Sequence, residues 1–549
     1  MTDTPLYASR LWPPVRRRAA DPSASTMDLL ESLGFVGKTD ATGVHTLLPL
    51  GLRVHDRLAR IARTAFEERG LNSVGFPTLQ SRTLWEQSGR WATYQAEGAL
   101  LTTRSHSGEE LCLAPTSEEI AVATVREHLR SYRDLPVRLF LSTSKFRDEL
   151  APRGGMMRGR EFTMADAYTF DTSPEDMRTS TGLLNDACRA ALCAMGLTGV
   201  FQAPADGGSI SAGPSTEHLV LGDIGQSTLL ACDYCGHRGD AALLTALPPF
   251  ASDPVVNVIA FTLTTVDGTS TPAAVAIRSD LHVSPRKLAA ASGAVHVELL
   301  DAEHLPALFG KHAGTLTPWD CTGTPLYFDH SVASLEKFSV SDGAAGLRTG
   351  VSWSGATGLP ALSPTSSDLS QAAPGMTCGR CTQGRFHEVR CVEVAHVFEL
   401  GTQYAAPMGL NFTDQQGRSR TPHMACSGIG ITRCLQTLAE LHRDTLGLRW
   451  VPQAAPADLH LTVLRPDLPG MRERTDRTVH QLRARGARLF VDDRPEPSGE
   501  KFRYAALLGL PRSLVLSPQH DDDIELIDRA TSRTRRMPLV HIPDTWSTN

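Results

Sequence analysis

Two pairs of cysteines set the strongest constraint on how this chain folds. Cys232 and Cys235 form one pair, Cys378 and Cys381 form the other, and each pair has the Cys-x-x-Cys spacing of a metal-binding knuckle. Four thiolates brought together in this way suit a structural Zn²⁺ ion. Because residues 236–377 separate the pairs, the intervening chain must form an inserted domain if they are to meet. The alternative is two unrelated pairs of free thiols, and geometry decides between the two.

Length, charge and hydropathy exclude several classes of protein. At about 150 residues per domain, 549 residues predict three to four domains. A net charge of −6 excludes a strongly basic nucleic-acid binder, though not a local basic face. No apolar stretch is long enough to cross a bilayer, and the N-terminus lacks the order of a signal peptide. We therefore expect a cytoplasmic protein without a membrane partner, and its odd number of cysteines, 11, favours metal ligands or free thiols over disulfides.

Hydrophobic patterning divides the chain into regions. Residues 48–77 read as a helix followed by a short strand that ends at Pro77, and residues 240–375 are only loosely patterned. After a proline-containing hinge at 451–456, a compact α/β domain is predicted. Its expected strands are 459–463, 489–491 and 514–516, and its expected helices are 471–482 and 502–508. Arginine supplies nearly all of its positive charge, which suits phosphate and base recognition but equally suits a solvated mixed-charge surface.

Two motifs carry the chemistry. Lys145–Glu149 and Arg158–Phe162 lie about ten residues apart, which predicts an antiparallel hairpin with guanidinium groups on one face. Such a face binds phosphate, and a carboxylate within it can accept a hydrogen bond from a purine amino group. Gly428–Arg433 places an arginine at a strand-to-helix turn where glycines allow a ligand to approach the backbone. Either motif alone could be a salt-bridged surface feature, so their combination is the stronger indication.

The order of these features resembles the three signature motifs of class II aminoacyl-tRNA synthetases, and the details are similar to bacterial-type prolyl-tRNA synthetases. The resemblance extends over more than 400 residues. The matching segments are 48–77 (first motif), Trp85–Trp91, Pro115–Glu119, Lys145–Glu149 with Met157–Phe170 (second motif), Glu393–Tyr404, Cys426–Arg433 (third motif), and Asp492–Arg494 with Gly499–Phe502.

The resemblance implies an α/β (α+β) architecture with three parts. A catalytic domain built on an antiparallel sheet would comprise residues 1–231 and 382–455. An editing-like α/β domain would be inserted at 232–381, between the cysteine knuckles. An α/β anticodon-binding domain would follow at 456–549, and the helix of the first motif would lie at the interface of a homodimer.

The resemblance also implies a role for each site residue. Arg147 would bridge the proline carboxylate and the α-phosphate of ATP, and Arg433 would lie against the γ-phosphate. The remaining ATP-binding residues would be Glu149 at the adenine amino group, Phe162 stacked on the ring, Arg158 near the outer phosphates, and Thr402. The remaining proline-binding residues would be Thr116 and Glu118 at the imino nitrogen, with Asp166, Tyr168 and Cys426 around the pocket.

Some positions depart from the family pattern. Ala165, Ser427 and His218 stand where the family has Lys, Tyr and Phe, and Ser211 replaces a glycine. We interpret them as changes around one pocket, which suggests a divergent second copy or a variant shaped to tolerate an inhibitor of the ordinary enzyme. In the insertion, Arg278, Asp280, Lys287 and Trp353 are kept. The editing lysine upstream of Arg278 is missing and Leu347 replaces a histidine, so we expect weak or absent alanine editing.

The function predicted from these observations is ligation of L-proline to its tRNA through a prolyl-adenylate. ATP would be a substrate with Mg²⁺, structural Zn²⁺ would bind the cysteines, and the partners would be proline, proline tRNA and a second copy of the chain. A paralogue that activates another small amino or imino acid is one alternative. A non-catalytic nucleotide- or tRNA-binding relative is the other.

Overall fold

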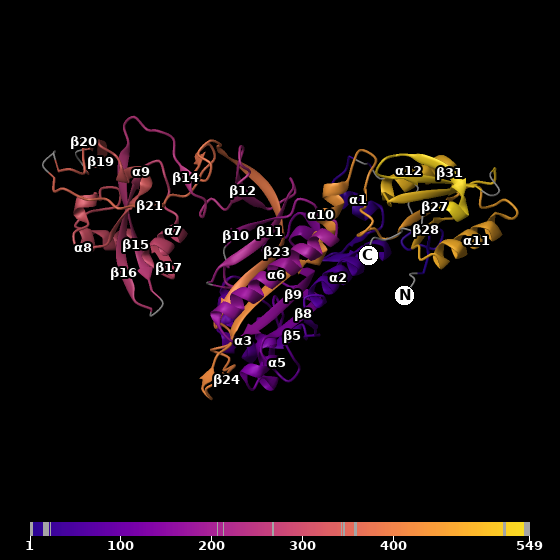
Figure 1. The fold of residues 1–549 in the computed structure, drawn as a ribbon, viewed down its shortest axis with the longest axis horizontal. Helices are drawn as coiled ribbons and strands as arrows, with labels where there is room; N and C mark the ends of the chain where they lie inside the picture. The colour runs from indigo at the N-terminus through magenta and orange to yellow at the C-terminus, as the bar shows by residue number, and fades with distance from the viewer. Residues whose placement is uncertain are drawn as a thin grey trace. The chain divides into compact units, whose positions relative to one another are not determined.

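The computed structural model describes residues 4–14, 21, 23–205, 207–211, 213–265, 268–341, 343, 346–355, 359–519 and 523–542. They form two compact units. The first unit comprises Met1–Gln202, Asp206–Ile224 and Val392–Asn549, and the second comprises Ala203–Ala205 and Gly225–Cys391 (Figure 1). The second unit therefore interrupts the first along the chain. None of the described helices qualifies as a membrane-spanning segment.

A mainly antiparallel sheet organises the first unit. Its path runs β10-β11-β23-β26-β9-β8-β4, with β10 at Phe201–Ala205. The two expected arginine-bearing segments do form a hairpin, because β8 and β9 pair antiparallel from Val137↔Phe170 to Phe146↔Glu161. The strands are β4 (Asn72–Ser73), β8 (Val137–Phe146), β9 (Glu161–Asp171), β11 (Ser215–Leu221), β23 (Phe386–Gly401) and β26 (His423–Gly430). The strand expected to end at Pro77 is shorter, ending at Ser73, although the Val74 N–H still donates to Phe140 (2.8 Å).

The two faces of this sheet have different roles. Alternate residues of a strand point to opposite faces, so Ala165 and Ala167 of β9 enter one core while Tyr168 and Phe170 enter the other. Helices α2 (Pro49–Glu67), α6 (Pro174–Ala194) and α10 (Ile431–His442) contribute to the first core (Figure 1). Helix α5 (Glu118–His128) contributes to the second. The face toward α5 carries the polar residues described below.

Short elements connect α2 to α5. Ser81 caps α3 by accepting from the Leu84 N–H, and Gly89 joins α3 to α4 with a φ of +79°, which glycine adopts readily. These elements are β5 (Leu79–Ser81), α3 (Arg82–Ser88), α4 (Arg90–Ala96), β6 (Leu101–Arg104) and β7 (Glu110–Leu113). Before α2 the chain forms α1 (Thr26–Ser32), β2 (Val36–Lys38) and β3 (His45–Leu47).

The C-terminal α/β region has a sheet of order β1-β28-β27-β29-β30-β31. All five predicted elements are present: β27 (Leu459–Val463), α11 (Met471–Ala484), β28 (Leu489–Asp492), α12 (Ser498–Leu508) and β29 (Arg512–Leu516). Three strands were not predicted. β30 (Asp523–Asp528) and β31 (Thr534–Pro538) extend the sheet, and β1 (Leu6–Tyr7) joins it from the start of the chain, with Leu6 opposite Phe490.

The second unit contains a second sheet and a cysteine-bearing ribbon. The sheet has the order β20-β19-β15-β16-β18-β21, with β17 paired to β15. Its strands are β15 (Val255–Thr264), β16 (Ser270–Arg278), β17 (His296–Leu299), β18 (Leu326–Asp329), β19 (Phe338–Ser341), β20 (Leu347–Val351) and β21 (Ser366–Ser367), with helices α7 (Pro285–Ser292), α8 (Leu305–Phe309) and α9 (His330–Ala333). The ribbon contains β12 (Ser227–Cys232), β13 (Arg238–Gly239), β14 (Ala246–Leu247), β22 (Thr377–Cys378) and the start of β23.

Candidate active site

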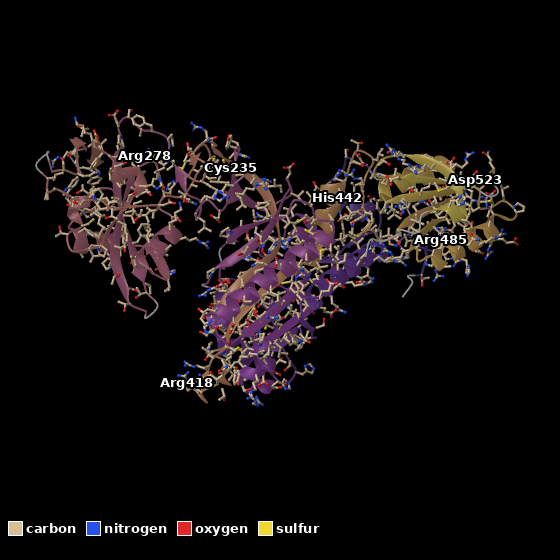
Figure 2. The ribbon with its side chains drawn as sticks, viewed as in Figure 1. Cys235, Arg278, Arg418, His442, Arg485 and Asp523 are labelled. Atoms are coloured by element: carbon tan, nitrogen blue, oxygen red, sulfur yellow. The ribbon has the colours of Figure 1, made fainter. Side chains whose placement is uncertain are left out.

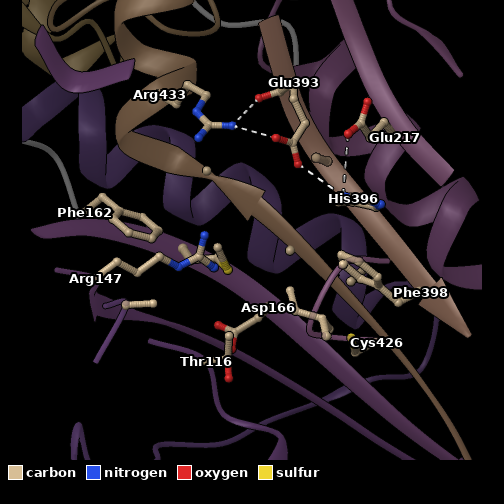
Figure 3. A pocket seen from close by; sticks show the side chains of 18 of the residues that line it. Thr116, Arg147, Phe162, Asp166, Glu217, Glu393, His396, Phe398, Cys426 and Arg433 are labelled. Atoms are coloured by element: carbon tan, nitrogen blue, oxygen red, sulfur yellow. Dashed lines mark hydrogen bonds and ion pairs between the residues drawn. The ribbon is translucent and has the colours of Figure 1, made fainter. Parts of the chain in front are cut away.

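A cavity of about 440 Å³ opens on the α5 side of the central sheet. Residues from β9, β23, β26, the start of α5 and the loop at 207–210 line it (Figure 3). The lining includes nearly all the site residues predicted from the sequence: Thr116, Glu118, Arg147, Glu149, Arg158, Phe162, Asp166, Tyr168, Cys426 and Arg433. Thr402 is not among the lining residues. It is half-buried in the turn after β23, where its carbonyl accepts from the Ala406 N–H (2.9 Å).

Arginines gather at one end of the cavity. The Arg147 guanidinium carbon lies 5.3 Å from the centroid of the Phe162 ring (Figure 3). Arg158 Nε donates to Glu149 Oε2 (2.6 Å), so the predicted adenine-reading carboxylate already has an arginine partner. Arg433 is fixed by two carbonyls, of Met157 (2.9 Å) and Glu393 (2.7 Å). This end can neutralise phosphate oxygens and present a flat aromatic surface beside them.

An acidic cluster lies next to these arginines. The ligand atoms of Glu217, Glu393 and His396 all lie within 4.8 Å of one another (Figure 3). Burial opposes ionisation of Glu393, but the hydrogen bond from His396 and the field of Arg433 outweigh it and lower the pKa of Glu393 to about 2. Sequence analysis missed His396 and gave Glu393 no role. The available signal was the presence of both within the apolar run 392–400.

The other end of the cavity is a buried polar floor. Lys145 Nζ lies 2.8 Å from Asp166 Oδ2, which also accepts from the Tyr168 hydroxyl (2.8 Å). Burial raises the pKa of Asp166 despite the charge of Lys145, and burial together with Asp166 raises the pKa of Tyr168. Asp166 Oδ1 has no hydrogen-bond partner among the described residues. A buried, unpartnered acceptor in a cavity indicates a site for a ligand that donates a hydrogen bond.

Most of the family departures lie behind the sheet, so their predicted gathering around one pocket is corrected. Ala165 belongs to the core shared with α6. His218 is fully buried, and its Nε2 lies 3.0 Å from the side-chain oxygen of Asn185 on α6. Ser427 lines the cavity, but it stands opposite Ala167 of β9, whose side chain belongs to the core shared with α6. The alternation of strand residues explains the error, because these positions face α6.

The two cysteine pairs meet in the second unit. Cys232 Sγ lies 3.6 Å from Cys381 Sγ, and Cys235 Sγ lies 3.9 Å from Cys378 Sγ (Cys235 is labelled in Figure 2). All four sulfur atoms lie within 4.8 Å of one another. Around a Zn²⁺ ion with Zn–S bonds of about 2.3 Å, tetrahedral sulfurs lie about 3.8 Å apart, which is close to these two separations, so the cluster could hold zinc.

The residues of the second unit that resemble an editing site are engaged in holding the domain together. Arg278 pairs with Asp280 (2.6 Å) and is labelled in Figure 2. Lys287 Nζ donates to the carbonyls of Leu244 (2.7 Å) and Ser370 (2.6 Å) and pairs with Asp368 (2.8 Å). These contacts satisfy all three protons of the Lys287 ammonium.

Comparisons with known proteins agree with this geometry. Residues 100–442 match the family described as tRNA synthetase class II core domain (G, H, P, S and T), and residues 468–548 match the anticodon binding domain. A proline--tRNA ligase of Desulfovibrio desulfuricans is 33% identical over 93% of this chain and 92% of the relative. One from Elusimicrobium minutum is 31% identical over 97% of each chain.

Solved structures support the same fold. A Giardia lamblia prolyl-tRNA synthetase in complex with prolyl-adenylate aligns with a TM-score of 0.58 and 13% identity, covering 94% of this chain and 74% of that one. A Cryptosporidium parvum prolyl-tRNA synthetase complexed with L-proline and AMP aligns with a TM-score of 0.56 and 12% identity, covering 96% and 75%. By its sequence relatives over nearly the whole chain and by the two matching domain families, this chain belongs to the prolyl-tRNA synthetases, class II enzymes with an anticodon-binding domain.

Proposed function

We propose that this chain activates L-proline with ATP and transfers it from prolyl-adenylate to proline tRNA. The observation that supports this most is one cavity with an arginine-rich end and a buried acidic end, where Asp166 Oδ1 is an unpartnered acceptor. A nucleotide suits the first end and a small amino acid with a protonated nitrogen suits the second. Family membership over nearly the full length of the chain supports the same activity.

Activation needs positioning and charge neutralisation more than a general base. A carboxylate oxygen of proline attacks the α-phosphorus, a new O–P bond forms, and the bond to the departing pyrophosphate breaks. We assign Arg147 to the carboxylate and α-phosphate, and Arg158 and Arg433 to the outer phosphates. Phe162 would stack on adenine, and Glu149 would accept from its amino group. The proline nitrogen would donate to Thr116 and Glu118, with Asp166, Tyr168 and Cys426 enclosing the ring.

We assign the Mg²⁺ that accompanies ATP to the cluster of Glu217, Glu393 and His396. Carboxylate oxygens are the ligands that this ion prefers, and the low pKa of Glu393 keeps that carboxylate ionised. The bound ion would help to neutralise the charge that develops on pyrophosphate. Arg433 supports the cluster by pairing with Glu393 (3.2 Å between Nη1 and Oε2).

Exchange of pyrophosphate into ATP, measured with proline, alanine and cysteine, tests the activity. We expect proline to be preferred by at least about a hundredfold in kcat/KM, since it alone of the three fills a pocket shaped for a ring. Preference for another amino acid would favour a paralogue with a different substrate. Nucleotide binding without exchange would favour a non-catalytic relative.

We further propose that the four-cysteine cluster binds structural Zn²⁺ and closes the base of the second unit. The sulfur spacing supports this assignment. Metal analysis of the purified protein is expected to give about one zinc per chain. A preparation that is fully folded without zinc would contradict the assignment.

We propose that the second unit edits alanine weakly or not at all. Arg278 and Lys287 are occupied by internal partners, and Leu347 offers no polar atom where the family has histidine. The test is release of alanine from Ala-tRNA of proline specificity, expected near the uncatalysed rate. Rapid release would refute the proposal.

We propose that the arginine-bearing C-terminal region contacts tRNA and that α2 lies at a homodimer interface. Arg535 and Arg536 of β31 are exposed, and Leu52 of α2 exposes 46% of its surface. Affinity for tRNA should fall steeply with added salt, as phosphate neutralisation predicts. Sedimentation should give twice the mass of one chain.

A further inference from the structure

Arg90, the first residue of α4, lies buried behind the cavity in a cage of aromatic side chains. It exposes 4% of its surface, and its guanidinium carbon lies 4.4 Å from the ring centroid of Tyr94 and 5.1 and 5.2 Å from those of Trp85 and Tyr404. A buried guanidinium held by aromatic faces is expensive to desolvate. Its position therefore calls for anionic partners.

The partners of Arg90 are two adjacent carboxylates at the start of α5. Its Nη1 lies 3.1 Å from Glu118 Oε2, 3.1 Å from Glu119 Oε1 and 3.2 Å from Glu119 Oε2. Glu119 also accepts from the Ser88 hydroxyl (2.8 Å), and it does not line the cavity. Glu118 does line the cavity. Arg90 thus connects a carboxylate that can meet a ligand to one that cannot.

The buried charges beneath the cavity do not balance. Arg90 and Lys145 supply two cations, while Glu118, Glu119 and Asp166 supply three carboxyl groups. All five side chains expose 5% of their surface or less. With all of them ionised, one negative charge lacks a partner in a medium of low dielectric. A ligand that brings a protonated nitrogen to Glu118 completes the balance.

We propose that Arg90 is a positioning residue for amino-acid activation: it orients the Glu118 carboxylate and keeps it ionised as the receptor for the cationic nitrogen of the substrate. This inference rests on the proposed function, because it takes Glu118 to be the group that meets the substrate nitrogen. Arg90 does not itself reach the substrate, since it is absent from the cavity lining.

The electrostatics of the cluster support this role. Burial alone would raise the pKa of Glu118, but the charge of Arg90 outweighs it, with help from the Thr116 hydroxyl and Lys145, and the pKa falls below its ordinary value. Burial and the neighbouring Glu118 raise the pKa of Glu119, so Glu119 takes up a proton more readily than the receptor carboxylate does. The ionisable and charged groups that face Glu118 are Arg90 from α4, Glu119 from α5, Lys145 from β8, Asp166 and Tyr168 from β9, Tyr404 from the turn after β23, and Cys426 from β26.

Pyrophosphate exchange by the full chain tests the proposal through KM for proline and KM for ATP between pH 6 and 8.5. In Arg90→Met we expect KM for proline at pH 7 to rise at least about thirtyfold, because one partner of a buried charge pair is removed. KM for proline should then fall as pH rises, since Glu118 must lose a proton to bind. KM for ATP should not change. Arg90→Lys keeps the charge on a shorter side chain that lacks the second terminal nitrogen, which in Arg90 donates to the Tyr94 hydroxyl, so its KM for proline should lie between those of the parent and Arg90→Met.

Arg126→Met is the matched control. Arg126 is exposed on the same helix as Glu118, and its Nη1 donates to the Met408 carbonyl (2.6 Å), away from the carboxylates. Its KM for proline should equal that of the parent. Circular dichroism and melting curves verify that each variant is folded, and if Arg90→Met does not fold, Arg90→Lys decides alone.

The outcomes separate this inference from the proposed function. A rise in KM for proline with its new pH dependence supports the role of Arg90. An unchanged KM for proline with a lower kcat or a smaller active fraction makes Arg90 merely structural and overturns the inference, while proline activation stands. If the parent activates no proline, the proposed function falls, and the inference falls with it.

Discussion

Replacing His218 by Phe should remove a specific part of the pH dependence of stability. His218 of β11 is fully buried against α6, and burial lowers its pKa to about 4, with the charge of His396 as a smaller contribution. The unfolded chain, with a pKa near 6.5, binds this proton more readily than the folded one does. The contribution of His218 to the free energy of unfolding is therefore fully present above about pH 6.5 and is lost as the pH falls toward about 4.

The size of the effect follows from the two pKa values. Between pH 7 and pH 5, a shift from about 6.5 to about 4 lowers the free energy of unfolding by about 2 kcal/mol. Phe does not titrate, so the free energy of unfolding of His218→Phe should fall by about 2 kcal/mol less than that of the parent between pH 7 and pH 5. Its stability at pH 7 is a separate matter, because Asn185 also loses a partner. The measured quantity is only the change with pH.

Urea titrations at pH 7 and pH 5, followed by tryptophan fluorescence, give the free energies of the parent and the variant. His106→Gln is the control, because His106 is exposed. His460, whose burial lowers its pKa to about 4, contributes equally to all three proteins and cancels. If the free energy of unfolding changed equally between pH 7 and pH 5 in the parent and in His218→Phe, the assigned role of His218 would be refuted.

Three further perturbations have definite expectations. Arg147→Ala should lower kcat/KM in pyrophosphate exchange by about two to three orders of magnitude with an unchanged melting temperature, since it removes a transition-state contact; normal activity would exclude that contact. Cys378→Ser should abolish zinc binding by metal analysis and lower the melting temperature of the second unit, and retention of a full zinc equivalent would argue against the four-sulfur site. Gly509→Ala should destabilise the first unit by at least about 2 kcal/mol in urea titrations, because φ there is +67° and a Cβ would lie 1.7 Å from the Leu448 carbonyl oxygen. Gly499→Ala, with nothing within 4 Å of the added Cβ, is its control and should be nearly neutral.

The sequence was most informative where local patterns and motifs coincide. In the C-terminal region, alternating strand and helix patterns predicted β27, α11, β28, α12 and β29, because each buries a face of characteristic period. β1 escaped prediction because two residues carry no periodicity, and their pairing with β28 joins segments nearly 500 residues apart. The exposed pattern of β31 likewise gave no hydrophobic signal.

The site residues also fall into those that local motifs reveal and those that only the fold reveals. Arg147, Phe162 and Arg433 could be named from the sequence because they sit in motifs that place charge and aromatic surface at recognisable turns. Arg90 could not be assigned a task, because its partners Glu118 and Glu119 belong to a different helix and only the fold brings them together. A charged residue in a helix is ordinarily solvated, and nothing local distinguishes one that is buried.

The family departures change meaning once they are placed on the sheet. Had Ala165, Ser427 and His218 surrounded the substrate, they would have argued for a different amino acid. Instead Ala165 packs in the core shared with α6, Ser427 stands opposite Ala167 of that core, and His218 contacts Asn185 of α6, so all three lie on the α6 face of the sheet. Because neighbouring core positions change together to keep their volume and hydrogen bonds, such a group is expected from repacking between sheet and helix. The floor of the cavity meanwhile keeps every group proposed to bind proline, so the drift behind the sheet is no argument against proline as the substrate.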